Sequence, residues 1–318
     1  MTNGENMIIS ASRRTDIPAF YSEWFVNRLK AGYVYVRNPM NPKQISKIPL
    51  NTEDIDCIVF WTKNAAPMFD KLDRIDALGY QYYFQWTMTL YGKDIEYNLP
   101  EKAKVIDSFK VLSNKIGSHR TIWRYDPIIV SQQFTIEYHV HTFAKMCHLL
   151  KGYTNKCIFS YVDLYAKTCK NAKGIIDSEV DILSMLKIAE EFAEIARLNN
   201  ISLETCSEQI ELSQFGIRHA ACINKHTIET IIGYAIDRKK AKGQREYCQC
   251  IDSVDIGAYD CCPHGCVYCY ATASEKAVLE NRKRHDVNSP LLIGRPCATD
   301  KITERIVKNL KNSQMVLF

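Results

Sequence analysis

Val254-Asp255-Ile256-Gly257-Ala258 leads, after three residues, into Cys262-Pro263-His264-Gly265-Cys266-Val267-Tyr268-Cys269. The first stretch has the apolar alternation of a β-strand, and the second is a short loop with three thiols at C-x3-C-x2-C spacing. A [4Fe–4S] cube usually takes four thiolates, so a loop that offers three leaves one iron open to a ligand from outside the protein. The sequence therefore predicts a strand whose end carries an open-site iron–sulfur cluster on Cys262, Cys266 and Cys269.

Short β-rich runs alternate with helical stretches along the rest of the chain. The predicted strands are Met7–Ala11, Tyr33–Val36, Asp56–Trp61, Tyr80–Met88, Thr121–Trp123, Lys156–Val162, Ile201–Thr205 and Val254–Ala258. The predicted helices lie at residues 18–31, 65–77, 101–116, 135–151 and 177–198, and the last has the clearest helical period. This alternation indicates an α/β fold with a parallel sheet, either open or closed into a (β/α) barrel.

The cysteine-bearing strand comes last in the chain, but chain order does not fix a strand's place in a barrel. We therefore expect Val254–Ala258 to pair directly with Met7–Ala11, in a circularly permuted barrel or partial barrel. On this interpretation residues 1–247 form the β/α body, 248–289 the cysteine-rich segment that completes it, and 290–318 a tail.

Two segments depart from the strand–helix pattern. Residues 33–50 contain Asn38-Pro39 and Asn41-Pro42, which favours a hairpin over a barrel strand. The tail is predicted to be helical from Asp300 to Asn312, with apolar residues recurring on one face that docks on the core.

Polar side chains follow most of the predicted strands, at the point where each strand ends. The groups are Ser12-Arg13-Arg14-Thr15-Asp16, Thr62-Lys63-Asn64, Gln85 with Thr87 and Thr89, Arg124 with Asp126, Ser160 with Asp163, and Glu204 with Cys206. In an α/β barrel these carboxyl ends meet on one face, where active sites form. Any one of these residues fits a structural role, but six such strand ends together predict a shared functional site.

The composition is that of an ordinary globular protein: 318 residues, 46% hydrophobic, 24% charged, with a formal net charge of +5. No apolar run reaches the roughly 18 residues of a transmembrane helix, and the polar N-terminus does not resemble a secretory signal. Thirteen cysteines without such a signal argue against a disulfide framework and favour metal ligands in a reducing compartment. We therefore expect a cytoplasmic protein that does not contact a membrane.

Three interpretations fit the cysteine-rich segment 248–269. A radical-generating cluster suits the spacing of the triad and the aromatic Tyr268. Zinc accepts four cysteines, or three with a histidine such as His264. A purely electron-transferring cluster is the third.

Four more cysteines lie outside the triad and outside obvious core runs, namely Cys206, Cys222, Cys248 and Cys250. Four thiols suit a second iron–sulfur cluster or a zinc ion, and the alternative is a set of scattered reduced thiols. Only Cys248 and Cys250 are close in sequence, so no spacing rule decides between these.

The cysteine loop resembles the signature of the radical S-adenosylmethionine superfamily, in which it lies near the start of the catalytic domain. Nearly the whole chain is similar to an uncharacterised bacterial family, domain-of-unknown-function family 1848 (DUF1848), whose C-terminal cysteine cluster has the same likeness. The matching stretches are Ser253–Ala271, Ile9–Pro18, Phe60–Asn64, Trp123–Pro127 and Glu204–Glu208. A more distant likeness is to the spore photoproduct lyase family, through Tyr268-Cys269-Tyr270, Thr62-Lys63 and Arg124–Pro127.

The resemblance implies a radical S-adenosylmethionine enzyme that forms a 5′-deoxyadenosyl radical and abstracts hydrogen from a substrate, with an electron donor such as flavodoxin or ferredoxin. Tyr268 is then expected near the adenine, and Arg13, Arg14, Lys63 or Arg124 at the cofactor carboxylate. Ser12, Thr87 and Asp126 are candidates for its amino group or ribose.

The motifs indicate no substrate and no catalytic residue; a small molecule, a peptide and a nucleic acid are all compatible. The alternative to an enzyme is a non-catalytic protein that is stabilised by zinc, or that uses its cluster for electron transfer or sensing.

Overall fold

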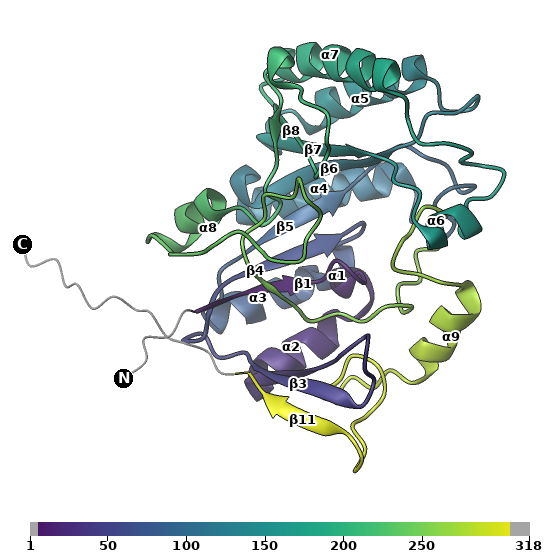
Figure 1. Ribbon diagram of the computed structural model, residues 1–318. Coiled ribbons are helices and arrows are strands. Elements are labelled where there is room, and N and C mark those ends of the chain that lie inside the picture. Colours follow the sequence, from purple (N-terminus) through teal and green to yellow (C-terminus); the bar gives the residue numbers. More distant parts are fainter. Residues whose placement is uncertain (1–5, 306–318) are drawn as a thin grey trace, which may run out of the picture.

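The computed structural model describes residues 6–305, which form an α/β fold around an eight-stranded parallel sheet (Figure 1). In spatial order the strands are β10 (Val254–Asp255), β1 (Met7–Ala11), β4 (Ile55–Thr62), β5 (Tyr82–Thr87), β6 (Thr121–Ile128), β7 (Lys156–Tyr161), β8 (Ser202–Thr205) and β9 (Arg218–His219). Each strand is parallel to its neighbours, so all their carboxyl ends lie at the same edge of the sheet.

The predicted pairing of the cysteine-bearing strand with the first strand is observed. Ile9 lies opposite Val254 and Ser10 opposite Asp255, in parallel register. The strand ends at Asp255 rather than at the predicted Ala258, because the Asp255 carboxylate accepts a hydrogen bond from the Gly257 amide and turns the chain. Segments from opposite ends of the sequence thus form adjacent strands at one end of the sheet.

Alternate residues of each strand face two different cores. Phe60, Phe84 and Trp123 belong to the larger core, together with buried side chains of the helices that cover this face of the sheet. Val59 and Tyr83 belong to the smaller core on the other face. That face is covered by the residues between β9 and β10, in the green segment that crosses the sheet in Figure 1.

The helices are α1 (Ile17–Phe20), α2 (Ser22–Ala31), α3 (Phe69–Ala77), α4 (Lys102–Ile116), α5 (Ile136–Leu150), α6 (Ala166–Asn171), α7 (Ile182–Leu198), α8 (Lys225–Ile232) and α9 (Glu275–Lys283), with 3₁₀ turns at Ala66–Met68, Ser118–Arg120 and Ser213–Phe215. The predicted helix 18–31 is in fact two helices. The predicted helix 177–198 begins only at Ile182, because Asp181 is its N-cap and accepts the Ser184 amide. Within residues 6–305, none of these helices has the length and apolar character needed to span a bilayer.

A second, three-stranded sheet contains the predicted hairpin. Strands β2 (Tyr33–Arg37) and β3 (Gln44–Pro49) are antiparallel, and β11 (Lys301–Glu304) adds in parallel to β3. The predicted tail helix is therefore wrong at residues 301–304, which are extended because they pair with β3; the rest of that prediction, 306–312, lies outside the described residues.

Candidate functional site

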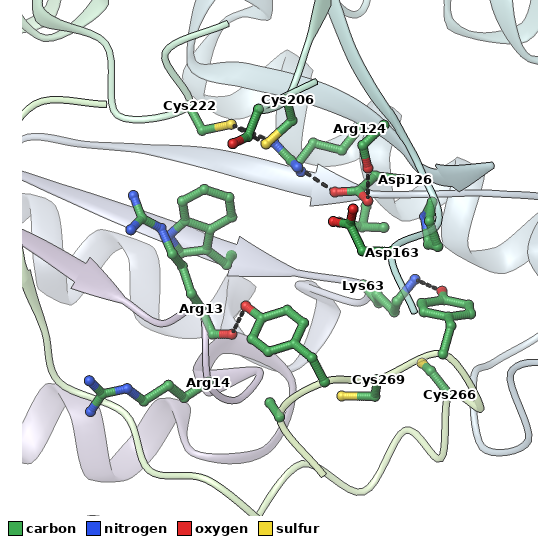
Figure 2. A pocket seen from close by; sticks show the side chains of 18 of the residues that line it. Arg13, Arg14, Lys63, Arg124, Asp126, Asp163, Cys206, Cys222, Cys266 and Cys269 are labelled. Carbon is green, nitrogen blue, oxygen red and sulfur yellow. Dashed lines mark hydrogen bonds and ion pairs between the residues drawn. The ribbon is translucent and has the colours of Figure 1, made fainter. Parts of the chain in front are cut away.

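A cavity of about 450 Å³ opens at the carboxyl ends of the parallel strands. Every residue that the sequence predicted for a cofactor or metal lines it: Ser12, Arg13, Arg14, Lys63, Thr87, Arg124, Asp126, Cys206, Cys222, Cys248, Cys250, Cys262, Cys266, Tyr268 and Cys269. Figure 2 shows Cys206 and Cys222 at one end of this cavity and Cys266 and Cys269 at the other. The two predicted cysteine groups thus face one shared space.

The cysteine loop is fixed against β1 and β4 through its histidine. His264 is buried, and its Nε2 lies 2.7 Å from Asp16 Oδ2, which also accepts the Lys63 amide at 2.7 Å. Gly265 has φ +68°, and a Cβ there would lie 3.3 Å from the Tyr97 side chain. His264 therefore anchors the loop, and Gly265 lets the loop turn so that Cys262 and Cys266 on either side line the cavity.

Lys63 places a fixed positive charge beside the cysteine loop. Its Nζ donates to Glu96 Oε1 and to the Tyr268 hydroxyl, both at 2.7 Å. Burial alone would raise the pKa of Glu96, but the charges of Lys63 and Lys102 lower it to about 2. An ammonium group has three donor hydrogens, so Lys63 keeps one beyond these two bonds.

The Asp255 carboxylate holds the end of β1 against β10. It accepts hydrogen bonds from Ser10 Oγ at 2.9 Å, Ser12 Oγ at 2.7 Å and the Arg13 amide at 2.8 Å. Arg14 lies 3.8 Å from the same carboxylate, and Figure 2 shows its side chain directed away from Cys266 and Cys269. The backbone at the end of β1 thus sends Arg13 and Arg14 in different directions.

Two guanidinium groups lie near the ring of Trp61 in the cavity lining. The Arg13 and Arg124 guanidinium carbons lie 5.2 and 5.3 Å from the centre of its ring. Arg124 is only 4% exposed and pairs with Asp126, which also accepts from Ser160 Oγ at 2.5 Å. The Arg124 guanidinium is thereby held at the cavity wall by its contacts with the Trp61 ring and the Asp126 carboxylate.

The thiols of the loop lie in surroundings that penalise negative charge. Burial raises the pKa of Cys262 well above its usual range and that of Cys266 to about 12. A metal reverses this effect, because its charge deprotonates a thiol that coordinates it. Within residues 6–305, no group of three or more His, Cys, Asp or Glu side chains is placed to hold a metal ion.

Four side-chain atoms of the cavity residues are buried without a hydrogen-bond partner among the described residues: Arg13 Nη2, Thr15 Oγ1, Ser207 Oγ and His264 Nδ1. Buried polar groups are normally paired, so these atoms indicate that the cavity receives a polar ligand.

The sequence predictions missed several residues that shape the site. Two of them could have been found from the sequence. Trp61 ends a predicted strand next to Thr62-Lys63, and Asp255 is a charged residue in an apolar strand. No pattern in the sequence indicates Glu96 or Arg245, because they lie in irregular segments and reach the site only through the fold. Arg245 pairs with Asp163 and donates to the Cys206 carbonyl at 3.3 Å.

Fold and site together define an α/β protein whose cavity, at the carboxyl ends of a parallel sheet, is lined by seven cysteines. The chain belongs to the family described as "Domain of unknown function (DUF1848)", whose sequence model matches residues 8–271. No curated protein matches the chain with significant sequence similarity.

Similar solved structures resemble the chain only weakly. They include a D-hydantoinase (10% identity, TM-score 0.29, 67% of this chain and 42% of that one) and an amidohydrolase from an environmental sample of the Sargasso Sea (8%, 0.29, 71% and 57%). A third is the HpcH/HpaI aldolase from Desulfitobacterium hafniense DCB-2 (9%, 0.24, 68% and 86%). The chain thus spans less than two thirds of the hydantoinase and the amidohydrolase.

Proposed function

We propose that this protein is a radical S-adenosylmethionine enzyme that holds a [4Fe–4S] cluster on Cys262, Cys266 and Cys269. The observation that carries the proposal is the common cavity: the three-cysteine loop shares it with cations and hydroxyl groups from the carboxyl ends of β1, β4, β5 and β6. Three ligands on one loop would leave one iron of a bound cluster without a protein ligand.

The order of the strands supports a permuted partial barrel of this enzyme class. The strand before the cysteine loop is adjacent to the N-terminal strand, although it comes from the other end of the chain. Moving that unit to the front of the sequence would give the usual order of strand, cysteine loop and following strands, with the sheet unchanged.

When bound, the reduced cluster and S-adenosylmethionine supply a 5′-deoxyadenosyl radical for hydrogen abstraction, with the electron provided by a donor such as flavodoxin or ferredoxin. The chain's own residues bind and orient. Lys63 has one donor hydrogen left and lies beside the loop, so it is the best candidate for the cofactor carboxylate. Arg124 is engaged by Asp126, and Arg14 by Asp255, which makes both weaker candidates.

Tyr268 acts as a positioning residue on this proposal. Its hydroxyl accepts from Lys63 and donates to Glu96 Oε1 at 2.5 Å, so its ring is held at the cavity wall beside Cys266 and Cys269. A fixed aromatic ring beside these two cysteines would suit contact with the adenine of a bound cofactor. Ser12, Thr87 and Asp126 supply polar groups along the same wall for the amino group and ribose.

The test compares Cys266→Ala with Cys297→Ala, which removes an exposed cysteine outside the cavity lining. Anaerobically reconstituted proteins are analysed for iron, for the electron paramagnetic resonance of the reduced cluster with and without S-adenosylmethionine, and for 5′-deoxyadenosine. We expect wild type and Cys297→Ala to give a cofactor-sensitive signal and 5′-deoxyadenosine, and Cys266→Ala to lose both.

A wild-type cluster whose electron paramagnetic resonance signal does not change on adding S-adenosylmethionine would instead favour an electron-transfer or sensor protein. Zinc in place of iron would favour the non-catalytic alternative.

A further inference from the structure

Two cysteines from neighbouring strand ends bring their thiols into contact at the wall of the cavity. Cys206 directly follows β8, and Cys222 lies three residues beyond β9. The two strands are parallel neighbours, with Thr205 opposite His219, and the Ala220 amide donates to the Thr205 carbonyl at 2.7 Å. This register carries both cysteines past the same edge of the sheet, where Cys206 Sγ lies 3.4 Å from Cys222 Sγ.

The surroundings of this pair differ from those of the core cysteines. Cys57, Cys147 and Cys157 are fully buried in apolar clusters, which is the ordinary place of a structural thiol. Cys206 is partly exposed, Cys222 is 2% exposed, and both line the cavity. A small molecule that enters the cavity can therefore reach Cys206, with the thiol of Cys222 next to it.

Two arginines direct their guanidinium groups at these sulfurs. Arg124 Nη1 donates to Cys222 Sγ at 2.8 Å, and Arg245 Nη2 lies 3.8 Å from Cys206 Sγ. Guanidinium groups gain little from neutral thiols, but they stabilise a thiolate, which is the form of cysteine that reacts. The contact with Cys222, together with burial, raises the pKa of Cys206 well above its usual range, so its reactivity should increase with pH.

We propose that Cys206 and Cys222 form a reversible disulfide, with a low-molecular-weight disulfide as the oxidant. A disulfide places its sulfurs about 2.05 Å apart, so the thiols must approach by about 1.4 Å, which is within the range of side-chain rotation. Among residues 6–305 no group of three or more His, Cys, Asp or Glu side chains is placed to hold a metal ion. A disulfide needs only the two sulfurs that are in contact.

The reaction is a thiol–disulfide exchange in two steps. Cys206 attacks first, because it is the more exposed of the two: its sulfur bonds to one sulfur of the small disulfide, whose S–S bond breaks and releases one thiol. Cys222 Sγ then attacks Cys206 Sγ, the mixed disulfide breaks, and the second small thiol leaves. The two cysteines lose two electrons and two protons in all, and the two small thiols gain them.

The disulfide ties the short strand β9 to β8 and changes what Arg124 contacts. Strand β9 contains only Arg218 and His219 and is last in the spatial order of the sheet. A disulfide sulfur carries no negative charge, so oxidation weakens the acceptor of Arg124 Nη1 and leaves that donor to a ligand in the cavity. The redox state of the pair is therefore coupled to the charge that the cavity offers.

This inference does not rest on the proposed enzyme activity, because it involves neither the cysteine triad nor S-adenosylmethionine. The test uses the full chain, purified with a reductant, freed of it, and then incubated anaerobically with oxidised glutathione. Remaining thiols are alkylated before trypsin digestion, and mass spectrometry is performed without reduction. Trypsin cleaves after Arg218, so Cys206 and Cys222 fall in separate peptides, residues 198–218 and 219–225, each with one cysteine.

We expect these two peptides to be joined, the intact chain to be lighter by two hydrogen atoms, and dithiothreitol to reverse both changes. Because the pKa of Cys206 is raised, joining should be several-fold faster at pH 8.5 than at pH 7. Cys222→Ser should stop at a mixed disulfide of Cys206 with glutathione, whereas Cys206→Ser should leave the buried Cys222 unmodified. Cys169→Ser, which changes an exposed cysteine outside the cavity lining, should form the disulfide as wild type does.

The wild-type protein decides the main point without any substitution, and circular dichroism identifies a variant that fails to fold. The proposal is wrong if the exposed Cys169 and Cys297 carry glutathione while the two peptides stay separate. A bond from Cys222 to residues 246–276, which contain Cys248 and Cys250, also overturns it. Neither result bears on 5′-deoxyadenosine formation by wild type, so the two proposals fail separately.

Discussion

Gly257 is the residue at which the ends of β1 and β10 meet most closely. A Cβ at this position would lie 2.0 Å from Ser12 Oγ and 2.6 Å from Ser12 Cβ. Ser12 cannot move aside freely, because its hydroxyl donates to Asp255 at 2.7 Å and accepts the Arg14 amide at 2.9 Å. The geometry of the cavity wall therefore requires a residue without a Cβ at Gly257.

We expect Gly257→Ala to destabilise the protein by about 1–3 kcal/mol, the usual range for forcing extra atoms into a packed site. The control is Gly92→Ala, where the new Cβ would meet only the tip of the exposed Asp94 side chain, at 2.6 Å. Urea unfolding of both variants measures the difference. Equal stability of the two would show that Ser12 and Asp255 are not held as the hydrogen bonds indicate.

At this scale the sequence predicted which residues would gather but not what each would touch. Residue type and position at strand ends were enough to select Arg13, Lys63 and Arg124. The sequence could not show that Lys63 is held by Glu96, or that Arg13 and Arg124 both lie near the Trp61 ring. Such contacts depend on which strands are neighbours and on loops that have no periodic pattern.

Helix α5 contains a histidine that the fold keeps neutral. His139 is fully buried; its Nε2 lies 2.7 Å from the Ile129 carbonyl, and its Nδ1 lies 3.0 Å from the Tyr125 hydroxyl. Burial lowers the pKa of His139 from 6.5 to about 4, although the bond to Ile129 acts in the opposite direction. Below pH 6.5 the unfolded chain therefore binds a proton that the folded chain does not.

This linkage predicts a loss of stability as the pH falls from 6.5 to 4, amounting to about 3 kcal/mol from this residue. His139→Gln should lower stability at pH 7 but lose less of it over the same pH interval. His148→Gln, an exposed position on the same helix, should behave like wild type. Urea unfolding at pH 7, 5.5 and 4.5 gives the comparison, and equal pH slopes for wild type and His139→Gln would contradict the prediction.

A buried carboxylate just before strand β11 joins it to the hairpin, in addition to the backbone pairing with β3. Arg37 binds Asp300 through two hydrogen bonds, of 2.8 and 2.9 Å, and the Asp300 side chain is only 3% exposed. We expect Asp300→Asn to speed amide hydrogen exchange in residues 301–304. Glu304→Gln breaks only the exposed contact with Lys47 and should change exchange little. Unchanged exchange in Asp300→Asn would mean that backbone pairing alone holds the strand.

Strand β11 also shows why some elements could not be predicted correctly from the sequence. Residues 300–312 carry a helical apolar period, yet residues 301–304 are extended because β3 offers a partner and Arg37 a counter-charge. The period of the apolar residues indicates which face of a segment is buried. It cannot predict that the segment will pair with a strand from the other end of the chain. The pairing of β1 with β10 was predictable for a different reason: the cysteine loop had to reach the strand ends that carry the polar groups.

For the whole molecule, the cavity depends on the segment between α8 and β10. This segment covers one face of the sheet, carries Cys248 and Cys250, and places Arg245 on Asp163. It contains little regular structure, so its position depends on a few tertiary contacts.

That dependence predicts a change in proteolysis. Lys242 and Arg245 are exposed, and trypsin cuts after both residue types once the backbone can leave its position. We expect cleavage within 238–245 to be several-fold faster in Asp163→Asn than in wild type, because loss of the ion pair with Arg245 frees the segment from the end of β7. Cys297→Ser, which changes an exposed cysteine outside the cavity lining, should be cut at the wild-type rate. Mass spectrometry of timed digests locates the cuts, and equal rates in all three proteins would mean that the segment is held by contacts other than this ion pair.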